Sequence, residues 1–424
     1  MFNQGGLSLD QAPPISVVLR FFVTASIFGI LLGLFLLSQS LNITTLSSYS
    51  TQIIAVHTLS LGVMASFMLG ALFQMLPVLA GVVIKTPTIK AMMVHGLLSV
   101  GVFVQLFAFG ISSNSLLFFL ASAYLGSALF YAIYLMLKEL LKIKTHSSSS
   151  KGIIFALLSL IFTVIFGIYL LLTLGGFTNG VDFTQIKEIH YSFALFGWVS
   201  LLIVSVSFQV VEMFYVTPSY PTNMSRYLTL TILGLLIFKT ILTILDYSTN
   251  LLTATIAMLF LVYATVTINR LTQRKRPTAD ATVWFWLFGM AMFILSMTIV
   301  VIGSFLTIDS TLQHLSYIAF IGFALSIVFA MVYKIVPFLT WFHLSNQGYM
   351  EAPMMHDVIH PKKAKIHFYI HFVTIVIWLL TTDITWLGSL LLTISFGWLF
   401  YNLIFAIRKY IYTQKHCEKI EWGV

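Results

Sequence analysis

Long runs of uniformly apolar residues constrain this chain more than any other feature. The stretch 51–76, for example, contains no charged residue. Only 8% of the 424 residues are charged and the mean hydropathy is +0.98, whereas a soluble domain carries about 25% charged residues. Apolar runs of about 20 residues without alternation predict helices that cross a membrane, because lipid offers the backbone no water to bond. We therefore expect an all-α polytopic membrane protein.

The apolar runs predict twelve membrane spans, with a tight turn near Asp383 between the last two. They cover roughly residues 15–38, 51–76, 91–112, 115–140, 152–175, 187–213, 227–246, 250–269, 281–307, 312–340, 365–382 and 384–408.

The second, sixth and tenth spans share a pattern. Their glycines Gly62, Gly197 and Gly322 are 135 and 125 residues apart, and a histidine precedes each glycine. Polar residues and prolines follow at common offsets, in the order Gln74, Gln209 and Lys334, then Pro77, Glu212 and Pro337. A period near 130 predicts three repeats of four helices each. We expect these repeats at roughly 15–140, 152–269 and 281–408, within a single membrane domain covering 1–424.

Lysine and arginine follow the even-numbered spans and are nearly absent from the opposite loops, with Lys187 as the exception. Because basic loops stay on the cytoplasmic side, both termini are expected there, and we expect a bacterial inner membrane. The net charge of +9 therefore marks loops and does not indicate a nucleic-acid partner. The single cysteine, Cys417, excludes an internal disulfide framework.

His57, His190 and His314 open the three repeated spans and are expected at a common depth near the outer face. A histidine inside a membrane is costly unless it is paired, so it usually faces the bundle interior. The simpler interpretation is an imidazole bonded to a neighbouring hydroxyl or carbonyl. The alternative is a ligand, because neutral imidazole binds haem iron and copper.

With these features the chain resembles the haem-copper oxidase subunit I superfamily, which includes the nitric oxide reductases. His57, in HTLSLGVMASFMLGALF, is similar to the family's low-spin haem ligand, and His190, in HYSFALFGW, is similar to its copper ligand. The family's tenth helix carries two haem-binding histidines; here His314 stands alone, although the later YKIVPFL resembles the family's ending of that helix.

The seventh span, RYLTLTILGLLIFKTILTILDY, departs from the family because it lacks the histidine pair that completes the copper site. The resemblance thus implies one haem, held by His57 and His314, beside an incomplete copper site at His190. It implies respiratory electron transfer or the handling of nitric oxide or oxygen, like the haem and copper membrane proteins of the nitric oxide stress response. A cytochrome or quinol donor and small partner subunits are the implied partners, and catalysis is left open. The alternatives are a histidine-lined transporter and a copper-handling membrane protein.

Two charged residues in the membrane spans are further candidate functional residues. Lys239 lies in the middle of the seventh span and needs a partner, for which Asp246, seven residues on, is the expected candidate. Lys239 either extends its ammonium group toward the outer interface or supplies a positive charge in place of the missing copper ion. Glu212, at the inner end of the sixth span, is either part of a proton path or a surface acid.

A second histidine group follows the tenth span. His356 and His360 come after two methionines, and His367 and His371 open the eleventh span. A spacing of four places both rings of each pair on one helical face, and methionine with histidine suits copper. The simpler interpretation is interfacial histidines solvated among lysines.

Overall fold

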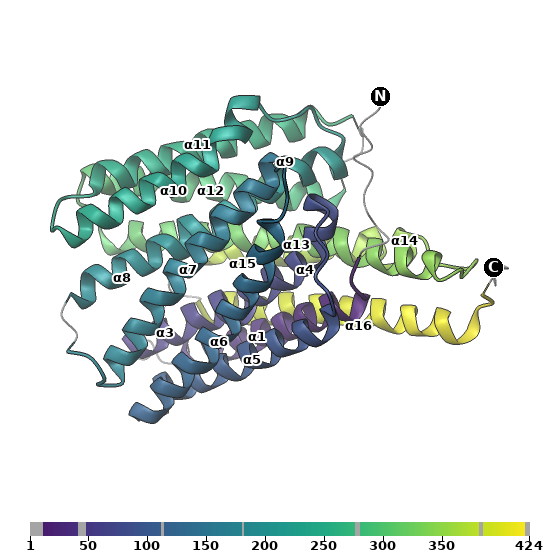
Figure 1. Cartoon of the computed structure of the whole chain (residues 1–424), viewed down its shortest axis with the longest axis horizontal. Coiled ribbons are helices and arrows are strands. Elements are labelled where there is room, and N and C mark those ends of the chain that lie inside the picture. Colours follow the sequence, from purple (N-terminus) through teal and green to yellow (C-terminus); the bar gives the residue numbers. More distant parts are fainter. Residues whose placement is uncertain are drawn as a thin grey trace.

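Three membrane helices are enclosed by nine others, and this arrangement confirms the predicted all-α fold with twelve spans. The computed structural model describes residues 12–40, 48–111, 114–179, 182–275, 280–380 and 385–419. Within these residues, twelve helical segments are long and apolar enough to cross a membrane (Figure 1). The predicted turn near Asp383 lies outside the described residues.

Nine outer helices form a closed ring in which each helix contacts the next and the last returns to the first. In ring order they are α1 (Ile15–Ser40), α5 (Pro87–Gly110), α6 (Ser115–Leu140), α7 (Ser148–Leu174), α10 (Thr222–Ile244), α11 (Asn250–Thr272), α12 (Ala281–Phe305), α15 (Pro361–Leu380) and α16 (Thr385–His416). Each predicted repeat contributes three consecutive members of this ring.

The second helix of each repeat lies inside the ring. The first inner span comprises α3 (Tyr49–His57), η2 (Thr58–Ala65) and α4 (Ser66–Ala80); the second comprises α8 (Phe183–Ser192), η3 (Phe193–Ser200) and α9 (Leu201–Tyr215); the third is α13 (Ser310–Asn346). The most apolar windows of these spans are 83%, 78% and 78% buried, against 28–50% for the nine outer helices. The threefold organisation predicted from the glycine spacing is therefore present in the fold.

The repeat glycines mark close contacts within each repeat. A Cβ atom on Gly62 would lie 2.7 Å from Phe28 Cγ on α1, and one on Gly197 would lie 2.6 Å from Ser159 Cβ on α7. On Gly322 it would lie 3.1 Å from Ile375 on α15 and 3.2 Å from Met292 on α12. Small residues allow membrane helices to approach closely, so each glycine lets an inner span pack on the first helix of its own repeat.

Two of the inner spans contain π-helical segments, which the sequence patterns do not predict. η2 follows His57 directly, and η3 begins three residues after His190. Gly62 and Gly197 each occupy the fifth position of their eight-residue segment. The third inner span, α13, is α-helical through Gly322. A π-helical turn changes which residues share a face and is common at functional sites.

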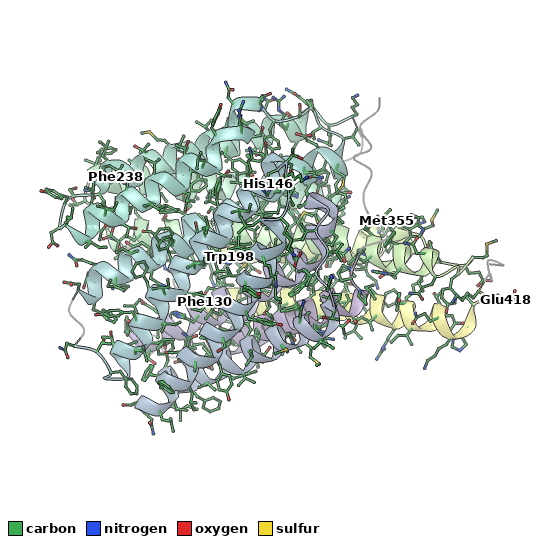
Figure 2. All side chains as sticks on the ribbon, in the orientation of Figure 1. Phe130, His146, Trp198, Phe238, Met355 and Glu418 are labelled. Atoms are coloured by element: carbon green, nitrogen blue, oxygen red, sulfur yellow. The ribbon has the colours of Figure 1, made fainter. Side chains whose placement is uncertain are left out.

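α1 begins and α16 ends on one side of the bundle, called here the terminal side, at the right of Figure 1. α3 and α8 lie at the opposite, far side. On the terminal side α13 and α16 run beyond the predicted ends at 340 and 408, reaching Asn346 and His416. The Gln347 amide bonds the Tyr410 hydroxyl at 2.8 Å, so polar contacts hold the extensions together beyond the apolar spans. The short helix α14 (Met355–Val358) contacts both α13 and α16, and Figure 2 shows Met355 on the terminal side.

Candidate functional site

His57 and His190 lie next to each other at the far side of the bundle. Their ring centres are 6.5 Å apart and the ring planes differ by only 13°. His57 comes from the last turn of α3 in the first repeat, and His190 from the last turn of α8 in the second. Both side chains are half-buried. The site is therefore built at the junction of two repeats.

Each of these imidazoles has one nitrogen engaged by a backbone carbonyl. His57 Nδ1 lies 2.8 Å from the Ile53 carbonyl oxygen, and His190 Nδ1 lies 2.9 Å from the Thr163 carbonyl oxygen on α7. Because a carbonyl only accepts, Nδ1 carries the proton on both rings. Nε2 of each ring is then the unprotonated nitrogen, which is the form that binds a metal.

The ring spacing suits a single metal ion between two imidazoles. Metal–imidazole bonds are about 2 Å long and each ring centre lies roughly 1.1 Å behind its nitrogen, so two imidazoles on opposite sides of one ion have ring centres about 6.3 Å apart. The observed 6.5 Å between the ring centres is close to this value, and the two ring planes are stacked at 13°. Within the described ranges, no group of three or more histidine, cysteine or acidic side chains is placed to hold a metal ion. The pair thus offers two nitrogen ligands.

Neighbouring helices fix both rings. The Phe109 ring of α5 lies 5.5 Å from the His57 ring, and the Ser50 hydroxyl donates to the Phe109 carbonyl at 2.9 Å, which ties α3 to α5. On the other side, a Cβ atom on Gly167 of α7 would lie 2.9 Å from His190 Cε1. A glycine at 167 therefore leaves the space that the His190 ring occupies.

His314 does not share this environment. It lies on the first turns of α13, its side chain is exposed, and the described residues include no hydrogen bond or ring contact to it. The structure thus brings His57 together with His190, whereas the resemblance implied a pair of His57 with His314. α13 also lacks the π-helical segment that the other two inner spans contain after their histidines.

The expected pairing of Lys239 with Asp246 is wrong. The buried ammonium of Lys239 forms an ion pair with Glu188 on α8 and donates to Thr249 Oγ1 at 3.0 Å. Asp246 instead accepts a hydrogen bond from Gln185, because the chain leaves α10 at Ile244 and Asp246 has a positive φ of 59°. Both links join α8 to the α10 end, and Glu188 stands two residues before His190. Lys239 is therefore a positioning residue for the histidine site.

The polar residues that follow the repeat glycines have separate structural roles. Glu212 accepts from the backbone N–H of Tyr220 at 3.0 Å and so holds the turn after α9. Lys334 pairs with Asp280, the N-cap of α12. Burial raises the pKa of the Asp280 carboxyl, but the Lys334 ammonium, together with hydrogen bonds from Thr282 and the Val283 backbone, keeps the pKa below its usual value. Gln74 is buried, and its amide has no hydrogen-bond partner among the described residues.

His367 and His371 share one face of α15, as their spacing predicts, but the expectation that they are solvated is wrong. Both are fully buried. His367 Nδ1 lies 3.0 Å from the Tyr333 hydroxyl and its Nε2 lies 2.8 Å from the Ser395 hydroxyl, so both nitrogens are engaged. His371 Nε2 lies 2.8 Å from the Ser326 hydroxyl. These contacts join α15 to α13 and α16.

His356 and His360 do not share a helical face, which corrects the expectation from their spacing. α14 ends at Val358 and Ile359 is extended, with φ −133° and ψ 109°. Both imidazoles are exposed, and His360 Nδ1 accepts from the Lys362 backbone N–H at 3.2 Å. Pro361 starts the next helix and prevents α14 from continuing.

Two residues that support the histidine site, and a third elsewhere in the bundle, were missed by sequence reasoning. Glu188 and Gly167 stand far from their partners in the chain, and no local pattern marks them. Asn402, which donates to the Tyr333 hydroxyl at 3.1 Å, could have been singled out as an amide inside an apolar span.

No protein-family model matches the chain, and a search of the curated proteins finds no match either.

The ion pair leads to an asymmetric prediction, because the Lys239 side chain is only 6% exposed and that of Glu188 is 35% exposed. Glu188→Gln leaves a buried ammonium without its counter-charge and should lower the free energy of unfolding by about 3 kcal/mol. Lys239→Met leaves a carboxylate that water can reach and should cost about 1 kcal/mol or less. Thermal and denaturant unfolding of the protein in detergent measures both.

Lys142→Met is the matched control for this comparison. It breaks the exposed ion pair with Glu139 and should change stability by less than about 0.5 kcal/mol. Equal effects of Glu188→Gln and Lys239→Met would contradict the asymmetry, as would a control that costs as much as either.

Proposed function

We propose that this chain is a haem-binding membrane protein that transfers electrons, in which His57 and His190 would together hold one haem iron. The observation that carries the proposal is the ring pair, with its 6.5 Å spacing, near-parallel planes and both Nδ1 atoms held by carbonyls. The outline of three four-helix repeats, which resembles the haem-copper oxidase superfamily, supports it as a fold-level analogy.

The number of ligands favours haem over a bare metal ion. A zinc site needs three or four protein ligands, and the copper site implied by the resemblance also needs more than one imidazole. No group of three such side chains occurs in the described parts of the chain. Haem iron already has four nitrogens from its macrocycle, so two imidazoles complete it. A two-histidine site is therefore sufficient for haem, whereas it has fewer ligands than a zinc site or the copper site implied by the resemblance.

The residues around the pair have defined tasks under this proposal. The carbonyls of Ile53 and Thr163 fix the tautomer of each imidazole and raise the basicity of Nε2. The ion pair of Lys239 with Glu188 holds α8 and thus the depth of His190. Haem iron, when bound, supplies reversible one-electron transfer. His57 and His190 would both hold the iron, and an iron held by two imidazoles would favour electron transfer over direct binding of nitric oxide or oxygen.

The proposal predicts a bis-imidazole haem spectrum for the purified protein. His57→Ala and His190→Ala should each abolish the reduced-minus-oxidised signature, because either change removes an axial ligand. His314→Ala and His367→Ala should retain it, since His314 is exposed and His367 has hydroxyl partners on both nitrogens. The pyridine haemochrome assay measures haem content independently of the ligands. A wild-type protein without haem, despite ample haem supply during expression, would refute the proposal.

The distribution of basic residues supports an orientation with the terminal side in the cytoplasm, in a bacterial inner membrane. Under the proposal, a cytochrome or a membrane quinol would donate electrons, and the far-side location of the pair favours a donor at the outer face. Cys417 provides the test of orientation, because it is the only cysteine and lies just after α16.

A membrane-impermeant maleimide should label Cys417 in inside-out vesicles and leave it unlabelled in intact cells. Reduced solvation and the nearby Glu351 carboxylate raise the pKa of the Cys417 thiol. Because the thiolate reacts, labelling should accelerate between about pH 7 and about pH 9 and should be faster at neutral pH in Glu351→Gln. Comparable labelling of intact cells and inside-out vesicles would contradict the orientation.

A further inference from the structure

An apolar cavity of about 80 Å³ lies where the three inner spans meet. Thirteen of its fifteen lining residues come from these spans, with five from α4, three from α9 and five from α13. The other two are Phe22 of α1 and Trp286 of α12. The cavity therefore lies on the axis around which the three repeats are arranged, and it is separate from the histidine pair at the far side.

Residues at equivalent positions of the three repeats line the cavity. Counted from Gly62, Gly197 and Gly322, the fifth, sixth and ninth following residues of all three inner spans line the cavity. The ninth residues are Ala71, Val206 and Met331, and all three are half-buried. The fifth and sixth residues of each span are buried. The surface that remains accessible at the ninth position of each span faces one shared space.

The chemistry of the lining selects the occupant. No lining residue is charged, and Trp286 is the only one with a polar side-chain atom. A buried water needs two to four polar partners, so water is disfavoured there, whereas dry apolar cavities bind xenon and small hydrocarbons. A space of about 80 Å³ is smaller than the roughly 150 Å³ cavity that holds benzene, which limits the occupant to a few atoms.

We infer that this axial cavity binds a small, uncharged and apolar gas molecule, the class to which dioxygen belongs. The side chains of Met331 on α13 and of Met68 and Met75 on α4 line it. They are flexible and polarisable, which suits transient entry of an apolar molecule from the surrounding lipid. The inference rests on the cavity alone and does not depend on haem at the histidine pair.

Xenon is the probe, measured by ¹²⁹Xe NMR of the purified protein in detergent and by anomalous density in xenon-pressurised crystals. One xenon site at the axis is expected for the wild type, with its occupancy reduced by competing dioxygen. Ala71→Leu should abolish the site because the added side chain fills the cavity. Ala123→Leu, on an exposed position of α6, is the matched control and should keep it.

Val206→Ala enlarges the same space and should increase xenon occupancy at a given pressure, so the inference remains testable if Ala71→Leu does not fold. Absence of xenon from the wild-type axis would overturn the inference, as would its persistence in a folded Ala71→Leu variant. Ordered water or a lipid chain filling the cavity would also overturn it.

Discussion

The close packing of each inner span on the first helix of its own repeat is the interaction on which the rest of the structure depends. Between helices in lipid there is little hydrophobic drive, so association relies on close contact between backbones and on scattered polar links. Gly62, Gly197 and Gly322 provide that contact against α1, α7 and the helices of the third repeat. In each inner span the fifth, sixth and ninth residues after this glycine line the axial cavity.

The repeats then diverge at the far side. The first two contain a π-helical segment after their histidine, and their imidazoles meet. The third has an uninterrupted α13 and an exposed His314. In the third repeat the buried histidines are His367 and His371 on α15, which form hydrogen bonds with hydroxyl groups on α13 and α16. The fold thus has three similar repeats. Two of them contribute a pair of histidines at their junction, and the third has histidines that hydrogen-bond its own helices together.

The residues that line the axial cavity differ in chemistry from those near the histidine pair. A transporter with a path along the axis needs polar side chains there, because charged or polar substrates are costly in an apolar environment. The cavity at the axis is lined without a single charged residue. The polar groups near the histidine pair, Glu188 and Lys239, are engaged with each other. The charged groups therefore lie beside the histidine pair, and the residues that line the axial cavity are uncharged.

Much of the fold could be predicted from the sequence, and less of the site. The spans and the repeats follow from apolar length and from the spacing of Gly62, Gly197 and Gly322, which are properties of a single helix or of a period. The pairing of His57 with His190 joins two helices that are far apart in the chain, and no residue pattern in the sequence signals the π-helical segments after them. The partner of Lys239 is Glu188, on another helix, and only the packed bundle brings the two together.

The central claim is that His57 and His190, from different repeats, meet with their Nε2 atoms directed at one metal. A cryo-electron microscopy map of the purified protein, resolved well enough to place side chains, tests it most directly. The account predicts both imidazoles next to each other at the far side, joined through the density of a macrocycle with its metal at the centre. A map in which the two rings face separate surroundings, or in which His57 pairs with His314, would contradict it.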